Sequence, residues 1–291
     1  LVADLGAPAT LNGCRYNCRV IIVDGRIVLV RPKRALADDG NYRESRWFTA
    51  WTRTNETSAW LLPECCRGLA VDGGDEVPFG DGAVVFDDCG LGCETCEELW
   101  TPDAPHIALA LNGIEIIANG SGSHHQLGKL DARMSLIQSA SGKGGGIYLY
   151  ANQRGCDGGR LYYDGCACIA VNGRIVAQGK QFDVRDVEVV VATVDLDEIR
   201  SYRSCFQSMS VQSAKSTLIS KVRVRHRLCV QDYVSHENRP NLSTARDIMF
   251  HSREEEIALG PACWLWDYLR RSGASGYFLP LSGGADSSST A

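Results

Sequence analysis

The chain has 291 residues, of which 30 are basic and 35 are acidic, so its formal net charge is −5. This near balance argues against a nucleic-acid-binding protein, which needs a strongly basic face. Hydrophobic residues make up 44% of the chain, enough to bury a sizeable core. No run of about 18 apolar residues is present, so no transmembrane helix is predicted. The length indicates one or two domains.

The thirteen cysteines predict free thiols rather than a disulfide framework. Their number is odd, and several lie in apolar, strand-like runs, which is typical of a protein in a reducing compartment. We therefore expect a cytoplasmic protein. The sequence opens with LVADLGAP, which is neither a signal peptide nor a transit peptide. Because residues 2–5 and 19–30 have the pattern of interior strands, we expect the chain to begin inside a domain.

Short apolar runs alternate with Gly, Asp and Asn turns through the first part of the chain. The expected elements, in chain order, are a hairpin over 19–30 that turns at Asp24-Gly25, a strand before Cys96, a strand over 114–118, a helix near 127–142, strands over 145–153 and 166–179 with a turn at Asn172-Gly173, and a strand leading into a helix over 187–203. Because hairpins interrupt a strict β–α alternation, the pattern predicts an α/β fold with mixed sheets.

The chain changes character after this first region. Residues 205–250 are polar, basic and less periodic, so we predict a first domain over 1–206, a linker over 207–250 and a second unit over 251–291.

A helix opens the second unit. Its predicted apolar face carries Ile257, Cys263, Leu265, Trp266 and Leu269, and acidic residues lie in its first turn. Glycines at 273 and 276 end the helix. The run Tyr277–Leu281 then predicts a buried strand that leads into a Gly-rich loop.

Two residues at strand ends could form a nucleophilic site. Cys96 follows a strand in CEELW, and Lys33 comes directly off the strand that covers 26–30. A cysteine nucleophile needs its thiolate, a cation that stabilises the thiolate and a base that takes the proton. The alternatives are a buried structural thiol and a solvated lysine, which are commoner for these residue types.

A zinc site is another alternative for the same segment. Cys89, Cys93 and Cys96 have the spacing C-x3-C-x2-C, but zinc needs a fourth ligand. The candidates are His106, His124 and His125, and their spacing fits no common zinc finger. No metal site is therefore predicted.

Several sequence blocks, in order along the chain, resemble the nitrilase superfamily. They are RPK…ALADDGNYRE, CEELWTP and NGSGSHH. The sequences of these blocks are similar to those of the glutaminase domain of glutamine-dependent NAD synthetases. ANQRGCDGGRLYYDGCACIAVNGRIVAQG looks like later strands of the same family, so the resemblance covers about residues 1–205. It implies a nitrilase-like α-β-β-α sandwich with mixed sheets.

The resemblance also implies a Glu–Lys–Cys triad. Cys96 would be the nucleophile, and Lys33 would stabilise the thiolate and the oxyanion, together with the backbone N–H that follows Cys96. Glu44 resembles a second, supporting carboxylate near the lysine. The general-base Glu belongs to a GPEL-type segment that nothing in residues 1–32 matches, so we expect it upstream of Leu1.

The glutamine site follows from the same resemblance. Tyr42, Ser123 and Lys129 match positions that hold the α-carboxylate and amine of glutamine. Lys129 stands where some relatives carry Arg, which replaces a bidentate clamp with a point charge.

The end of the chain carries a second motif, PLSGGADS. Glycines permit close backbone approach, and consecutive N–H groups at a helix N-terminus bind phosphate. The loop is not a Walker A motif; it looks like the PP-loop of N-type ATP pyrophosphatases, which implies the beginning of a Rossmann-like α/β domain. The residues expected to bind ATP and its Mg²⁺ are Pro280, Leu281, Ser282, Gly283, Gly284, Ala285, Asp286 and Ser287.

Together, the two resemblances imply a glutamine-dependent NAD synthetase. Glutamine hydrolysis through a cysteine thioester would supply ammonia for the ATP-dependent amidation of deamido-NAD, with AMP, pyrophosphate and glutamate as the other products. We expect glutamine, ATP and deamido-NAD as substrates, no permanent cofactor, a homo-oligomer, and neither nucleic-acid nor membrane partners. Alternatives are a free-standing nitrilase-type amidase and a truncated, inactive product that keeps only assembly surfaces. Residues 1–291 alone are expected to be inactive, because the base and the deamido-NAD site, which we expect beyond Ala291, would lie outside them.

Overall fold

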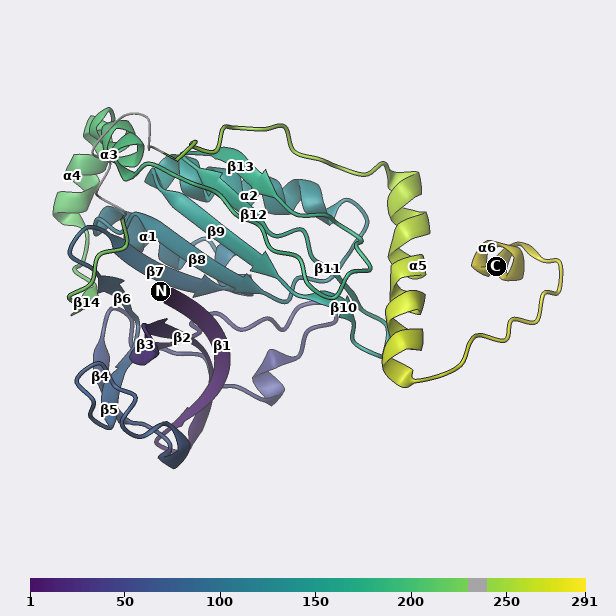
Figure 1. Ribbon diagram of the computed structural model, residues 1–291, viewed down its shortest axis with the longest axis horizontal. Helices are drawn as coiled ribbons and strands as arrows, with labels where there is room; N and C mark the ends of the chain where they lie inside the picture. The colour runs from purple at the N-terminus through teal and green to yellow at the C-terminus, as the bar shows by residue number, and fades with distance from the viewer. Residues whose placement is uncertain (230–239) are drawn as a thin grey trace.

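The computed structural model describes residues 1–229 and 240–291 of the chain. Two β-sheets stack face to face, and helices cover the outer face of the larger one (Figure 1). A separate two-stranded ribbon lies next to the long helix α5 (Arg253–Ser272).

The smaller sheet has the strand order β1-β2-β3-β5-β4. Its strands are β1 (Val2–Leu11), β2 (Cys14–Val23), β3 (Arg26–Pro32), β4 (Thr57–Leu61) and β5 (Glu76–Gly80). All neighbours are antiparallel except β3 and β5, which are parallel.

The larger sheet has the strand order β13-β12-β9-β8-β7-β6-β14. Its strands are β6 (Gly82–Val85), β7 (Gly90–Thr95), β8 (Ile116–Ser121), β9 (Ile147–Asn152), β12 (Cys168–Val171), β13 (Arg174–Gln178) and β14 (Ser220–Arg223). The central strands β7, β8 and β9 run parallel, so their carboxyl ends meet at one edge. β10 (Arg154–Cys156) and β11 (Tyr162–Asp164) form the separate ribbon.

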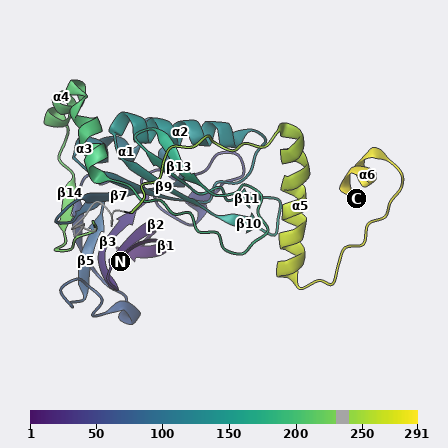
Figure 2. The same cartoon turned by 45° about the horizontal axis from the view of Figure 1, so that its top comes forward.

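The remaining elements are helical. They are α1 (Pro105–Leu111), α2 (Lys129–Gly144), α3 (Leu196–Ser204), α4 (Gln207–Lys215), α6 (Ala285–Thr290) and the 3-10 turns η1 (Glu44–Arg46), η2 (Glu64–Cys66) and η3 (Cys96–Leu99). Figure 2 shows α1 and α2 along the face of the larger sheet that points away from β1–β5. No helix among the described residues is both long and apolar enough to cross a membrane.

Apolar side chains form a core between the layers. Ile21 and Leu29 of the smaller sheet meet Val84 and Leu91 of the larger one. A second core lies between the larger sheet and α1 and α2. The pattern of β2 and the helical periodicity of α2 each bury an apolar surface, and β3 is buried at every position after Arg26. The mixed sheets and the nitrilase-like layering confirm the predicted fold class.

Most of the predicted elements are confirmed. The hairpin turn at Asp24-Gly25 joins β2 to β3, and the turn at Asn172-Gly173 joins β12 to β13. Asp24 and Asn172 both have positive φ, as a tight two-residue hairpin requires. The helix predicted near 127–142 is α2, and Gly273 ends α5 in a left-handed conformation.

Four sequence predictions are corrected. Residues 2–5 belong to the edge strand β1 rather than to an interior strand. The valine-rich run from residue 187 is extended but unpaired, so it is not a strand. The region 207–250 contains the helix α4 and the strand β14, and β14 pairs in parallel with β6. Tyr277–Leu281 is exposed coil, since no strand among the described residues lies beside it.

The buried face of α5 also differs from the prediction. Glu256, Gly260, Cys263 and Asp267 form its buried stripe, whereas the predicted apolar face carries Trp266, which is 52% exposed. Polar side chains occupy this stripe because the ribbon and the segment after β8 offer donors to the two carboxylates. Cys263 of this stripe packs with Tyr162 and Phe182.

Candidate active site

Three strand ends converge around Cys96. Cys96 follows β7 directly, Lys33 follows β3, and the segment that leads to Ser123 follows β8. Carboxyl ends of neighbouring parallel strands commonly form ligand sites, since the loops that leave them face the same space.

Cys96 itself has a left-handed backbone, with φ of 46°. This conformation is rare for a non-glycine residue and costs energy, and such residues cluster at active sites. Two hydrogen bonds stabilise the turn. The N–H of Cys96 donates to Asn119 Oδ1 at 3.2 Å, and the N–H of Thr95 donates to Glu98 Oε2 at 2.6 Å. The sharp turn from β7 into η3 leaves the thiol partly exposed.

Glu98 joins this turn to the end of β3. Its carboxylate is fully buried, accepts the N–H of Arg34 at 2.7 Å and pairs with the Arg31 guanidinium. Arg31 also pairs with Asp81 at 3.2 Å. Because Arg34 is adjacent to Lys33, Glu98 keeps the lysine and the cysteine turn in register.

Lys33 is buried and paired. Its ammonium lies 2.5 Å from Glu44 Oε2, and only 2% of the Lys33 side chain is exposed. Glu44 is held in turn by the N–H of Ala37 at 2.8 Å and by Asn17 Nδ2 at 2.7 Å. The structure thus brings together Lys33 and Glu44, which the sequence analysis predicted as partners.

The space beside Cys96 carries further charges. Burial raises the pKa of Glu97, although Lys33 and Lys129 oppose the shift. Burial and the Arg133 charge lower the pKa of Lys129, whereas Cys96, Asp164 and Glu97 act in the opposite direction. The Lys129 ammonium lies 5.8 Å from the Tyr42 ring centre and 5.7 Å from that of Trp100. Among the described residues, no carboxylate lies within ion-pair distance of Lys129.

Tyr42 and His124 join the loop between β3 and η1 to the segment after β8. The Tyr42 hydroxyl donates to the carbonyl of Gly122 at 3.0 Å and accepts the N–H of His124 at 3.2 Å. His124 Nδ1 lies 2.8 Å from the same hydroxyl. Tyr42 therefore shapes the site through its ring, while its hydroxyl is engaged in the loop.

Ser123 is buried in a polar network. Its backbone forms two hydrogen bonds with Asn152, at 2.9 and 3.0 Å, and its hydroxyl accepts from Arg133 at 3.4 Å. Arg133 in turn pairs with Asp164 at 2.9 Å. Ser123 thus contacts Arg133, which lies one helical turn of α2 after Lys129.

Sequence reasoning missed three residues of the site, namely Glu97, Glu98 and Asn119. Thr95 and Glu98 have the T-x-x-E spacing of a capping box, which could have identified Glu98. Glu97 is adjacent to the predicted nucleophile. Nothing local in the sequence distinguishes Asn119 from an ordinary strand-end residue, because its partner Cys96 follows another strand, β7.

The zinc alternative finds no support in the described ranges, 1–229 and 240–291, where no group of three or more His, Cys, Asp or Glu side chains could hold a metal ion. Cys93 is buried in β7, and His106 pairs with Glu94 at 3.2 Å. None of the thirteen cysteines forms a disulfide.

The Gly-rich loop lies apart from this site. Residues 280–284 are exposed coil, Gly283 has φ of 83°, and α6 begins at Ala285. The hydroxyls of Ser282 and Ser287 lie 3.0 Å apart. In Figure 1 an extended segment carries α6 away from the stacked sheets. The predicted loop and helix are present, without the strand expected before them.

Known proteins match both the sequence and the fold. The chain is 50% identical to a glutamine-dependent NAD(+) synthetase of Homo sapiens and 51% identical to one of Arabidopsis thaliana, over 292 residues and 100% of this chain. It spans about two fifths of these relatives, 40% and 39% of their lengths.

Solved structures agree with this match. The crystal structure of a glutamine-dependent NAD(+) synthetase from Cytophaga hutchinsonii superposes with a TM-score of 0.68 at 26% identity, covering 99% of this chain and 37% of that chain. A carbon-nitrogen hydrolase from Helicobacter pylori G27 shares the fold, with a TM-score of 0.53 at 18% identity over 73% of this chain and 67% of that chain. The family model described as carbon-nitrogen hydrolase matches residues 7–204, most of the two-sheet unit. The chain therefore belongs to the carbon-nitrogen hydrolase family.

Proposed function

We propose that the protein containing this chain is a glutamine-dependent NAD synthetase, and that these residues form its glutamine-hydrolysing unit. The observation that carries the proposal is the buried Lys33–Glu44 pair at the strand end next to the Cys96 turn. A buried lysine is costly unless it is paired or functional. Its place beside a strained cysteine supports a role in catalysis, in a chain half identical to such synthetases.

The chemistry begins with the Cys96 thiolate. It attacks the side-chain carbonyl carbon of glutamine, and the thiol proton passes to a general-base glutamate, as in the nitrilase pattern. Lys33 and the N–H of Glu97 stabilise the oxyanion. The C–N bond then breaks, and ammonia leaves with a returned proton. Water hydrolyses the resulting thioester, which releases glutamate and regenerates the thiol.

Glutamine recognition is assigned to the charged groups beside Cys96. Lys129 is a half-buried cation without a carboxylate partner among the described residues, so it suits the α-carboxylate of glutamine. Glu97 supplies a negative charge for the α-ammonium. Tyr42 contributes its ring, and Ser123 fixes the adjoining backbone. Glu44 pairs with Lys33 and so holds the lysine ammonium in place.

The Gly-rich loop is proposed to bind ATP. The left-handed Gly283 and the exposed N–H groups that open α6 suit phosphate oxygens, and Mg²⁺ would accompany the nucleotide. Residues 280–287 would then begin the unit that amidates deamido-NAD with the released ammonia. A cytoplasmic location, a homo-oligomer and the beginning of the second unit at residue 251 remain part of this proposal.

Substitution of the nucleophile tests the two-site scheme. In the full-length protein, Cys96→Ala should abolish glutamine-dependent NAD formation and spare NAD formation from ammonia. Cys205→Ala, which removes an exposed thiol, should leave both activities unchanged. Loss of both activities in Cys96→Ala would contradict the scheme. Glutamine hydrolysis without any ammonia-dependent NAD formation in the wild type would favour the amidase alternative.

A further inference from the structure

The first turns of α5 hold the segment between β8 and α2. Glu256 is 3% exposed, and its Oε2 accepts from His125 Nε2 and from the N–H of Gly128, both at 3.0 Å. Its Oε1 accepts from Arg253 at 2.7 Å. Burial alone would raise the pKa of Glu256, but these three donors outweigh burial and lower it. Glu256 is thus a buried carboxylate whose Oε2 is directed at the loop, while its Oε1 pairs with Arg253 on the same helix.

Gly128 explains why a carboxylate is needed there. It is the N-cap of α2, has φ of 77° and carries no side chain to cap the helix. A Cβ at Gly128 would lie 2.5 Å from the Arg253 guanidinium, which also pairs with Asp131 at 2.6 Å. Glu256 therefore supplies, from another helix, the negative charge that favours the amino end of α2.

His125 is enclosed from a second side. A Cβ added to Gly260, one turn after Glu256, would lie 3.2 Å from His125 Nδ1. The Phe182 ring contacts the imidazole edge-on, with ring centres 4.9 Å apart. Both contacts limit the movement of His125, so the position of α5 determines where the loop lies.

The same loop carries the proposed glutamine site. His124, next to His125, bonds to Tyr42, and Ser123 anchors to Asn152. Lys129 follows Gly128 as the first residue of α2. Every contact that α5 makes with this segment therefore lies within a few residues of a group assigned to glutamine.

We propose that Glu256 is a positioning residue for glutamine binding, through which α5, the helix that precedes the Gly-rich loop, sets the affinity of the Cys96 site. The proposal rests on glutamine hydrolysis at Cys96. Glu256 touches neither the substrate nor the reacting atoms. It places Gly128, and hence Lys129, so its loss changes the KM for glutamine rather than the chemical step.

Three variants of the full-length protein test this role. Glu256→Ala should raise the KM for glutamine about tenfold, or about 1.4 kcal/mol, with kcat changed less than about threefold. Glu256→Gln keeps an oxygen that accepts the Gly128 N–H, so it should restore most of the affinity. Ammonia-dependent NAD formation should be unchanged in both variants.

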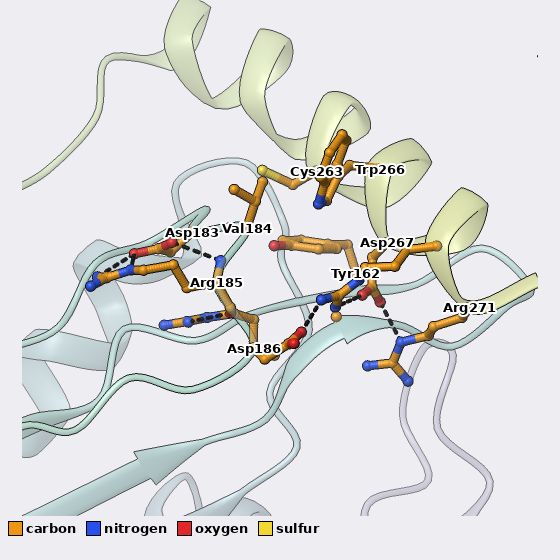
Figure 3. Close-up of a pocket in the computed structure, with 12 residues that line it drawn as sticks. Tyr162, Asp183, Val184, Arg185, Asp186, Cys263, Trp266, Asp267 and Arg271 are labelled. Atoms are coloured by element: carbon orange, nitrogen blue, oxygen red, sulfur yellow. Dashed lines mark hydrogen bonds and ion pairs between the residues drawn. The ribbon is translucent and has the colours of Figure 1, made fainter. Parts of the chain in front are cut away.

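Asp267 provides the matched control. It is a buried carboxylate on the same face of α5, and its Oδ2 accepts the N–H of Cys156 at 2.7 Å. Figure 3 shows Asp267 beside Tyr162, where it pairs with Arg271. Asp267→Ala should therefore leave the KM for glutamine within about threefold of the wild-type value.

The outcomes separate clearly. Hydrogen exchange at the Gly128 amide should accelerate in Glu256→Ala and not in Asp267→Ala. The positioning role would be overturned if Glu256→Ala left the KM for glutamine unchanged. It would also be overturned if Asp267→Ala raised this KM equally, or if Glu256→Gln raised it as much as Glu256→Ala does. Glutamine-dependent activity that survives in Cys96→Ala would instead refute the proposed function, whatever Glu256 does to exchange at Gly128.

Discussion

Lys129 offers a direct test of glutamine recognition, because its position carries several energetic costs. It is half-buried, has no carboxylate partner among the described residues, and stands at the first position of α2, where the helix dipole disfavours a cation. Burial and the Arg133 charge lower its pKa. A buried cation that lacks a carboxylate partner and lies at the amino end of a helix is unfavourable for stability, so we expect it to bind a ligand.

Replacing Lys129 with Met removes the charge and keeps the stem between Tyr42 and Trp100. A hydrogen bond to a charged group contributes about 1.5–3 kcal/mol, which corresponds to a rise of about 10- to 150-fold in the KM for glutamine. The kcat should change little, since Lys129 does not contact the scissile amide. Because a cation leaves the positive end of α2, the free energy of unfolding should rise by about 0.3–1 kcal/mol.

The assay is steady-state glutamine hydrolysis by the full-length protein with saturating ATP and deamido-NAD. Lys143→Met makes the same chemical change in the exposed last turn of α2 and should leave the KM unchanged. A KM for Lys129→Met within about threefold of the wild-type value would refute the assignment.

The pH dependence gives a second readout. The pKa of Lys129 lies below its ordinary 10.5, with burial as the main cause, the charge of Arg133 acting in the same direction, and Cys96, Asp164 and Glu97 opposing. The protonated form that binds a carboxylate is therefore fully present at low pH and is lost as the pH rises, before 10.5 is reached. The KM for glutamine should rise over that alkaline range in the wild type. Lys129→Arg should remain flat there, because arginine stays charged.

Two further predictions concern stability. Glu98→Gln removes a negative charge that pairs with the buried Arg31, so it should lower the free energy of unfolding by about 2–4 kcal/mol. Urea unfolding of the full-length protein measures this change. A change below about 0.5 kcal/mol would contradict the role of Glu98 in joining the Cys96 turn to the end of β3. Gly80→Ala should destabilise by more than about 3 kcal/mol, because φ is 145° and its Cβ would lie 2.1 Å from the Glu56 carbonyl. Gly276→Ala, with open space around it, is the control and should change the unfolding midpoint little.

Local patterns in the sequence predicted much of the fold. Hairpin turns at Asp24-Gly25 and Asn172-Gly173 require only positive φ at two adjacent positions, so they are visible without tertiary contacts. The period of α2 is likewise local. The prediction of a strand over Tyr277–Leu281 was wrong. A strand forms only beside a partner strand, and a pattern of apolar residues does not show whether such a partner is present.

The candidate active site likewise contains residues that the sequence predicts and residues that only the tertiary structure reveals. Cys96, Lys33 and Glu44 were predicted from sequence motifs, because residue type and position at a strand end can be read from the sequence. Glu98 joins β7 to β3 and Asn119 holds the Cys96 turn, and these roles depend on strands far apart in the chain.

The sequence by itself determined the family resemblance, the period of each element and the residues available for catalysis, because all three are properties of residue order. Only the tertiary structure decided which carboxylate meets which cation. It paired Lys33 with Glu44, directed Glu256 of α5 to Gly128 and left Lys129 without a carboxylate partner among the described residues. Buried charges are stable only with partners at hydrogen-bond distance, and those partners come from other layers of the fold.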